Sequence, residues 1–342
     1  MSKYNFLYDY AEGAHPDILD ALQKTNMTQQ LGYGEDEYCN EAAKLIKNQF
    51  DIPNAEVHFV SGGTQANMTV ISSILKPYES VIAAKTGHIA VHETGAIEFT
   101  GHKINTINTF DGKLTPELIE PVLTEHCDEH MVVPKLVYIS NSTELGTIYT
   151  KKNLEKLSTF CKKNNLLLFM DGARLGTSLT SKYQDLLPAE IKNYVDVFYI
   201  GGTKNGALSG EAIALINDRL KEKFRYSMKQ KGALLAKSRL FGIQFSVLFK
   251  NKLFFELATY SNKLAYNLAD GIKNLGYEFV ATPQTNIIFP VIPDKTIKEL
   301  ERKFMFYPWQ KYDKNNTIIR LVTSWATKEE KIDEFLETLK KQ

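Results

Sequence analysis

A lysine that directly follows a predicted strand is the residue of this sequence best placed for chemistry. Residues 195–211 read VDVFYIGGTKNGALSGE, and the alternating β-formers end at Gly201 and Gly202. The two glycines let the backbone turn tightly, so Lys204 is expected on a loop between two strands. An amine in that position can act as a nucleophile. For this segment alone, a surface lysine in a glycine-rich turn is the alternative.

Two further loops follow predicted strands and carry groups that complement such a lysine. Gly63 and Thr64 open a helix after the strand EVHFVS, so their backbone N–H groups suit a phosphate. Asp171 ends the strand LLLFM with a carboxylate, for which an ordinary helix-capping aspartate is the alternative. Ligands of open parallel sheets bind beyond the carboxyl ends of the strands, so the three loops are expected to meet. Together they provide what pyridoxal phosphate requires.

The order of predicted elements indicates an α/β protein. Strands are predicted at 56–61, 80–84, 103–108, 135–140, 166–170, 195–200 and 211–216, with helices at 64–75, 115–126 and 153–163 among them. This alternation predicts a mostly parallel sheet that is covered on both faces. Helical stretches follow at 218–229 and 234–275, and the second is expected to break near Gly242 and Lys250.

The C-terminal part is expected to be a separate, smaller α+β unit. Its predicted elements are strands at 276–281, 286–290 and 317–321, a helix at 296–304 and a last helix from Lys328. At the other end, helices are predicted from Pro16 and at 41–50, within an N-terminal arm that packs against something larger. We therefore expect the arm and a large cofactor-binding domain over 1–245, and a small domain over 246–342.

Composition narrows the class of partner. The 342 residues are 43% hydrophobic, and 41 basic against 40 acidic side chains give a net charge of +1. This balance favours a small-molecule partner and gives no sign of a nucleic-acid or membrane surface. Cys39, Cys127 and Cys161 have neither metal-binding nor disulfide spacing, and no long apolar run is present. We expect a cytoplasmic protein with reduced thiols and no metal site.

The motifs also resemble a known family. GGTQAN, GHIAVHETGA, DGARLG, GGTKNGAL and IIRLVTSW follow one another as in threonine aldolases, which belong to the β-eliminating lyases among the fold-type-I pyridoxal-phosphate enzymes. The resemblance runs from YGEDEY to RLVTSW, nearly the whole chain. It implies a large and a small domain, pyridoxal phosphate as cofactor, a small amino acid as substrate, and a homodimer or homotetramer.

The resemblance assigns roles to individual residues. Lys204 matches the lysine that forms the Schiff base, Asp171 the partner of the pyridine nitrogen, and His88 the histidine that stacks on the ring. Gly63 and Thr64 match the phosphate site. The remaining matches are Arg174 beside the cofactor, Thr203 in place of a typical serine, Arg320 for the substrate carboxylate, Asp9 and Tyr33 near the active site, and Arg239 at the phosphate of this or a neighbouring subunit. Without the family, a salt bridge at a strand edge is the alternative for Arg320.

One departure leaves the catalytic base open. Many members of the family carry Asn-Thr-His where this chain has Ser142, Thr143 and Glu144. The base expected for the β-hydroxyl is His88 or a water molecule that it positions, and the preference at the β-carbon stays open. The nearby His92 and Glu93 are further candidates for the base, although an ordinary helix-surface role is the favoured interpretation of each.

The expected reaction is retro-aldol cleavage of L-threonine, L-allo-threonine or a related β-hydroxy-α-amino acid to glycine and an aldehyde, a carbon–carbon lyase activity. The alternative reaction with the same cofactor is β-elimination on a small or aromatic amino acid. A cofactor-binding protein without catalysis would not need Lys204, Asp171 and Arg320 together. A nicotinamide-binding fold would need G-x-G-x-x-G after its first strand, and this chain lacks it.

Overall fold

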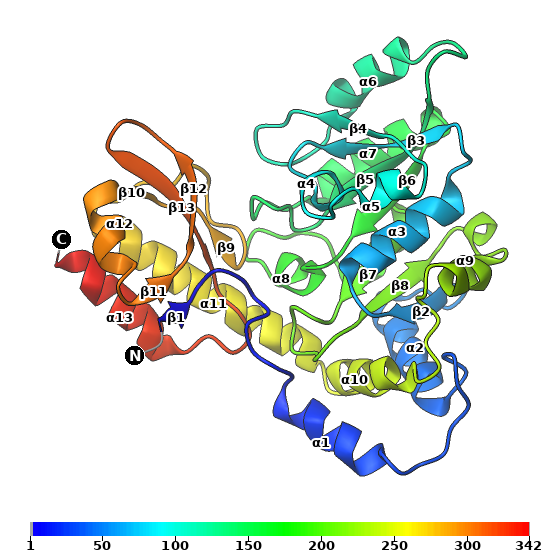
Figure 1. Cartoon of the computed structure of the whole chain (residues 1–342), viewed down its shortest axis with the longest axis horizontal. Coiled ribbons are helices and arrows are strands. Elements are labelled where there is room, and N and C mark those ends of the chain that lie inside the picture. The colour runs from blue at the N-terminus through cyan, green and yellow to red at the C-terminus, as the bar shows by residue number, and fades with distance from the viewer. Residues whose placement is uncertain (1–2, 342) are drawn as a thin grey trace.

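A seven-stranded sheet forms the centre of the molecule in the computed structural model, which describes residues 3–341 (Figure 1). The strand order is β2-β8-β7-β6-β5-β3-β4, and β8 runs antiparallel to both neighbours while the other pairs are parallel. The strands are β2 (Glu56–Val60), β3 (Glu79–Ala84), β4 (Ile104–Ile107), β5 (Val133–Ser140), β6 (Leu167–Asp171), β7 (Val197–Gly201) and β8 (Glu211–Leu215). The predicted mostly parallel sheet is confirmed, and each strand lies within two residues of its predicted bounds.

Both faces of this sheet are covered. Every residue of β3 and of β7 is buried. Within β3, Val81 and Ala83 belong to one core cluster, and Ile82 and Ala84 belong to the other. This division follows from the two-residue period of side chains along a strand. The continuous apolar runs that the sequence shows here therefore belong to a sheet buried between two layers of helices.

The helices before residue 251 supply those two layers. They are α1 (Pro16–Thr25), α2 (Glu37–Phe50), α3 (Gly63–Ile74), α4 (His88–Val91), α5 (Ala96–Phe99), α6 (Pro116–Glu125), α7 (Lys151–Lys163), α8 (Leu175–Leu179), α9 (Phe224–Gln230) and α10 (Arg239–Lys250), with 3-10 turns η1 (Pro188–Asn193) and η2 (Asp218–Leu220). Side chains of α3 and α9 pack in one cluster, and side chains of α2, α6, α7 and α10 pack in the other. In residues 3–341 no helix combines the length and the apolar character that a membrane span requires.

The C-terminal unit has its own core, to which residues 4–6 of the N-terminal arm also belong. Its elements are α11 (Leu253–Asn274), β9 (Ile287–Ile288), β10 (Val291–Pro293), α12 (Asp294–Leu300), β11 (Phe304–Met305), β12 (Tyr307–Lys311), β13 (Asn316–Val322) and α13 (Glu329–Lys340). The N-terminal β1 (Tyr4–Asn5) pairs in parallel with β11, as Figure 1 shows, and Phe6 is buried in the same core as α11 and α13. The first strand of the predicted arm therefore packs on the C-terminal unit, whereas its helices α1 and α2 pack against α10 of the large unit.

Several sequence expectations are wrong in this region. The helix predicted at 218–229 is divided at Lys223, whose φ of 59° is left-handed, into η2 and α9. The break expected at Gly242 is absent, because α10 runs through it; a Cβ there would lie 2.4 Å from the backbone nitrogen of Cys39, so glycine permits close packing of α10 on α2. The strand predicted at 276–281 has only a single bridge, from Phe279 to Pro290.

Candidate active site

A cavity of about 570 Å³ lies where β2, β5, β6 and β7 end. Eight of the residues that the sequence singles out line it: Gly63, Thr64, His88, Asp171, Arg174, Thr203, Lys204 and Arg320. Arg320 comes from β13 of the C-terminal unit, and the others come from the ends of strands of the large sheet and from the turns and helix starts that follow them. Strand ends thus bring together side chains that lie far apart in the sequence, as the open parallel sheet predicts.

Lys204 lies in the turn between β7 and β8 and faces into this cavity. Its Nζ is 5.9 Å from the ring centroid of Tyr10, another lining residue. Burial lowers the pKa of Lys204, and the nearby charge of Arg174 lowers it further. Both effects favour the neutral amine, which is the nucleophilic form of a lysine.

The turn that carries Lys204 is held by hydrogen bonds to both of its ends. The N–H of Gly202 donates to Oε2 of Glu211 at 2.9 Å, and the N–H of Gly210 donates to Oγ1 of Thr203 at 3.0 Å. Burial raises the pKa of Glu211 to about 8, although the charge of Lys204 acts in the opposite direction. Thr203 therefore fixes the shape of the turn through its hydroxyl, and Glu211 is a titratable neighbour of the lysine.

Asp171 ends β6 as a buried carboxylate with three hydrogen-bond donors. The hydroxyl of Tyr138 donates to Oδ2 at 2.5 Å, the side-chain amide of Asn67 donates to the same oxygen at 3.2 Å, and the N–H of Ala173 donates to Oδ1 at 2.9 Å. Burial and the Asp171 charge raise the pKa of Tyr138 well above its usual value, so its hydroxyl stays a donor. These contacts fix the carboxylate at the cavity wall.

The N-terminus of α3 provides the backbone donors that the sequence predicts. Gly62 is the N-cap, and no side chain caps this twelve-residue helix. The first N–H groups of the helix are therefore available to an anion, and the helix dipole favours one there. A Cβ on Gly63 would lie 3.0 Å from the hydroxyl of Tyr199, so the close approach explains the glycine.

His88 is held at the cavity wall by two glutamates. Its Nδ1 lies 2.7 Å from Oε1 of Glu93, and its backbone N–H donates to Oε1 of Glu144 at 2.9 Å. Asn67 donates to Glu93 at 2.7 Å, so one amide bridges Glu93 and Asp171. The interpretation of Glu93 as a helix-surface residue is wrong, because its side chain is fully buried beyond the end of α4. His92 is exposed, but it also lies beyond α4 and lines the cavity.

Two arginines place positive charge at the cavity. Arg174 donates from Nε to Oδ2 of Asp9 at 2.7 Å and from Nη2 to Oδ1 at 3.0 Å. Burial alone would raise the pKa of Asp9, but the charges of Arg174 and Lys204 outweigh it and lower that pKa to about 2. Arg320 donates from Nη1 to the carbonyl of Leu7 at 3.0 Å, and burial followed by repulsion from Arg174 lowers its pKa to about 10. Arg320 is therefore a charged group at neutral pH with the capacity to bind an anion.

Three residues of the sequence-predicted set, Arg239, Tyr33 and Asp9, do not line this cavity. The guanidinium of Arg239 donates to the carbonyls of Thr25 and Thr28 and lies over the ring of Tyr38. Tyr33 has a φ of 59°, and its ring lies 4.6 Å from Nζ of Lys229. Neither side chain lines the cavity within this chain. Asp9 lies behind the lining residue Arg174, to which it is hydrogen-bonded.

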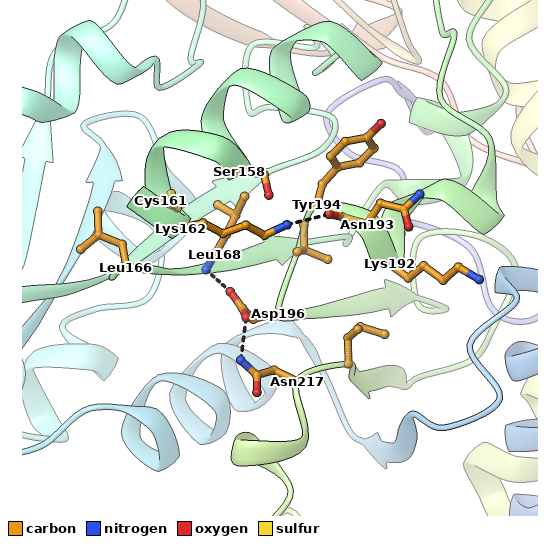
Figure 2. A pocket seen from close by; sticks show the side chains of 12 residues that line it. Ser158, Cys161, Lys162, Leu166, Leu168, Lys192, Asn193, Tyr194, Asp196 and Asn217 are labelled. Carbon is orange, nitrogen blue, oxygen red and sulfur yellow. Dashed lines mark hydrogen bonds between the residues drawn. The ribbon is translucent and has the colours of Figure 1, made fainter. Parts of the chain in front are cut away.

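A second cavity, of about 210 Å³, lies at the opposite ends of the same strands (Figure 2). Figure 2 shows that its polar groups bind one another: Asp196 accepts from the N–H of Leu168 and from the side chain of Asn217, both at 2.8 Å, and Lys162 donates to the carbonyl of Asn193 at 3.1 Å. These hydrogen bonds occupy the charged and polar side chains that a ligand of the second cavity would need. The first cavity is therefore the candidate active site.

Comparison with known proteins identifies the family. The family model described as beta-eliminating lyase matches residues 6–295. The chain belongs to the beta-eliminating lyase family. The solved structure of Leishmania major threonine aldolase is 49% identical, with a TM-score of 0.97 over 99% of each chain. The low specificity L-threonine aldolase of Pseudomonas sp. (strain NCIMB 10558) is 32% identical over 336 residues, 96% of this chain and 95% of the relative. The resemblance expected from the motifs is confirmed.

The fold extends to more distant proteins. An aspartate aminotransferase of Thermus thermophilus is 16% identical, with a TM-score of 0.74 over 99% of this chain and 91% of the other. This similarity concerns the fold alone. The predicted fold-type-I architecture of this beta-eliminating lyase family member is confirmed.

The sequence analysis did not predict several residues that line the candidate active site. They are Glu144, Glu211, Tyr8, Tyr10, Tyr307 and Trp309. Glu144 follows a predicted strand that ends beside the strand of Asp171. The reasoning that identified Asp171, a polar side chain at the end of a strand, could therefore have identified Glu144 as well. The rings of Tyr8 and Tyr10 stack with their centroids 4.6 Å apart. Residues two apart in an extended segment point to the same side, which brings these two rings together. No local signal marks Tyr307 and Trp309, because they reach the cavity from an exposed strand of the C-terminal unit.

Proposed function

We propose that this protein is a pyridoxal-phosphate-dependent carbon–carbon lyase that cleaves L-threonine, L-allo-threonine or a related β-hydroxy-α-amino acid to glycine and an aldehyde. The observation that carries the proposal is the meeting of Lys204, Asp171 and the N-terminus of α3 in one cavity. The full-length similarity to threonine aldolases supports the choice of reaction.

The residues present fit the cofactor. The uncapped N-terminus of α3 at Gly63 and Thr64 would hold its phosphate. The buried carboxylate of Asp171 would hold the pyridine nitrogen in its protonated form, and the amine of Lys204 would bind the aldehyde carbon. When bound, the cofactor supplies an electron sink for the bond that is cleaved.

Arg320 is suited to hold the carboxylate of the substrate. It lines the cavity from the C-terminal unit and keeps its charge, because a pKa of about 10 leaves it protonated at neutral pH. A planar guanidinium can bind a carboxylate through two parallel hydrogen bonds. Held at this end, an amino acid presents its α-carbon to the part of the cavity near Lys204.

His88 is proposed to pack against the cofactor ring and to take the β-hydroxyl proton or position the water that does. The contact of its Nδ1 with Glu93 fixes the orientation of the imidazole. Imidazole suits proton transfer because its pKa lies near neutrality. We propose that Arg174, which is oriented by Asp9, lies beside the cofactor.

The remaining proposals concern assembly, domains and compartment. Arg239 and Tyr33 lie outside this chain's cavity, and we propose that they act at the site of a neighbouring subunit in a homodimer or homotetramer. We propose that the large and the small domain divide at the break between α10 and α11 instead of at residue 245, because Leu248 and Phe249 of α10 pack in a core cluster of the large sheet. The first strand of the arm joins the small domain. We place the protein in the cytoplasm. Sedimentation of the active protein tests the assembly, and a fully active monomer would contradict it.

A substrate panel separates the proposed reaction from β-elimination. L-threonine, L-allo-threonine, phenylserine and tyrosine would each be incubated with the pyridoxal-phosphate-loaded protein, and the products would be identified. We expect glycine with the matching aldehyde from the β-hydroxy substrates and no product from tyrosine. An oxo acid with ammonia would instead assign an eliminating lyase, and no product from any substrate would reject a lyase.

A further inference from the structure

The carboxyl group of Glu144 is fixed at one oxygen and free at the other. Glu144 lies four residues beyond the end of β5 and lines the cavity. Its Oε1 accepts from the hydroxyl of Ser140 at 2.7 Å and from the backbone N–H of His88 at 2.9 Å. In residues 3–341 both hydrogen bonds that other residues donate to this carboxylate end on Oε1. The carboxylate is thus positioned by the protein and still has an oxygen for a ligand.

The surroundings of Glu144 make its carboxylate a stronger base. Burial raises its pKa, the charge of Asp171 raises it further, and the hydrogen bond from Ser140 and the charge of His88 act in the opposite direction. Tyr138, Tyr149 and Arg174 also face it closely enough for the charges to interact. A base is most effective when its pKa lies near the working pH, so this shift suits a proton acceptor.

Competing groups of the cavity are already engaged. Asp171 accepts from three donors, and Glu211 accepts from the turn that carries Lys204. The Nδ1 of His88 is held by the buried Glu93, which orients the ring. Among the lining carboxylates, Glu144 is the one next to His88, where the proposed reaction needs a base.

We propose that Glu144 is a catalytic residue that receives the proton of the substrate's β-hydroxyl, directly or through the water that His88 positions. This inference rests on the proposed function and names the base for it. The O–H bond breaks as a carbon–oxygen double bond forms, and the Cα–Cβ bond breaks with its electron pair left on Cα. The β-hydroxyl proton goes to Oε2 of Glu144, which later releases it to water, and a proton from water added at Cα completes glycine. The balance needs no oxidant or reductant.

The test compares Glu144→Gln with the wild type in two reactions of the loaded enzyme. Glutamine keeps an oxygen to accept from Ser140 and His88 but is a far weaker base than the carboxylate. Threonine cleavage is measured by aldehyde formation, and exchange of the glycine α-proton for deuterium is measured by NMR. Exchange involves no β-hydroxyl. We expect cleavage to fall about 100-fold or more while exchange changes less than about 3-fold, with the absorbance of the bound cofactor unchanged.

The control is Glu98→Gln, which removes an exposed carboxylate of the neighbouring α5 and should leave both reactions unchanged. Equal losses of cleavage and exchange in Glu144→Gln would overturn the inference, because they would mean that Glu144 only shapes the site. Unchanged cleavage would overturn it as well. A wild type that exchanges glycine but forms no aldehyde would instead reject the proposed function.

Discussion

Asp9 and Arg174 form a two-point ion pair that joins the N-terminal arm to the loop after β6. The distances are 2.7 Å from Nε to Oδ2 and 3.0 Å from Nη2 to Oδ1. Asp9 also accepts from the side chain of Asn286, in the C-terminal unit, at 2.9 Å. One buried carboxylate therefore connects the arm, the large sheet and the small unit behind the cavity.

Asp9→Asn should destabilise the protein and reduce the pH dependence of its stability. The variant leaves the buried Arg174 without its counter-charge, for which a loss of about 3 kcal/mol in the free energy of unfolding is expected. The pKa of Asp9 is about 2 in the folded protein against an ordinary 3.8. Its contribution of about 2 kcal/mol is therefore complete above about pH 4 and is lost as the pH falls toward 2.

Urea unfolding of both proteins between pH 7 and pH 3 measures this effect. The difference in unfolding free energy between wild type and Asp9→Asn should be constant from pH 7 to about pH 5 and shrink below pH 4. A difference that stays constant through this range would show that the carboxylate does not titrate as the ion pair requires.

Lys204→Ala should abolish turnover and leave the fold intact. The side chain projects from a turn into the cavity, so its loss opens no gap in either core cluster. Without the amine we expect turnover to fall more than about 1000-fold. Borohydride treatment of the loaded wild type should attach the cofactor to Lys204, as peptide mass spectrometry would detect.

A matched control is Lys156→Ala, on an exposed position of α7, which should keep full turnover. Attachment of the cofactor to any other lysine, or turnover that survives in Lys204→Ala, would refute the assignment of this residue.

Asp171→Asn should remove most of the activity while the cofactor still binds. The neutral amide cannot stabilise a protonated pyridine nitrogen, whereas the phosphate site at the start of α3 is untouched. We expect turnover to fall roughly 100-fold or more, with cofactor retained through gel filtration. Asp196→Asn, a carboxylate of the second cavity, controls for the general effect of such a change on the sheet. Wild-type turnover in Asp171→Asn would contradict its role.

The strand ends that form the site were predictable because their signals are local. A run of β-formers, one or two glycines and a polar side chain within ten residues define each loop. Parallel strands must end at one edge. Lys204, Asp171 and Gly63 follow from this argument. Gly242 shows the limit of this local reasoning. A glycine can mark the end of a helix or a close contact between two helices, and at Gly242 the position of α2 decides for the close contact.

The residues that sequence reasoning missed depend on contacts between distant segments. Glu93 is buried because Asn67 of α3 reaches it from 26 positions away. The first strand of the arm pairs with β11, some 300 residues later, so nothing in its own sequence indicates the partner. Such pairings follow only from the completed fold, because the backbone hydrogen bonds of a short segment could be made with many other segments.

Arg320→Ala is expected to weaken substrate use without affecting the cofactor. Loss of a charge-assisted, two-point contact with the substrate carboxylate should cost about 2–4 kcal/mol, or roughly 30-fold to 1000-fold in kcat/KM. Cofactor affinity and absorbance should stay unchanged, because the proposed phosphate and ring contacts all come from the large unit. Arg302→Ala, an exposed arginine of the same unit, is the control and should behave as the wild type. A variant of Arg320 that loses the cofactor, or that keeps its kcat/KM, would mean that Arg320 supports the structure through Leu7 and that another group binds the carboxylate.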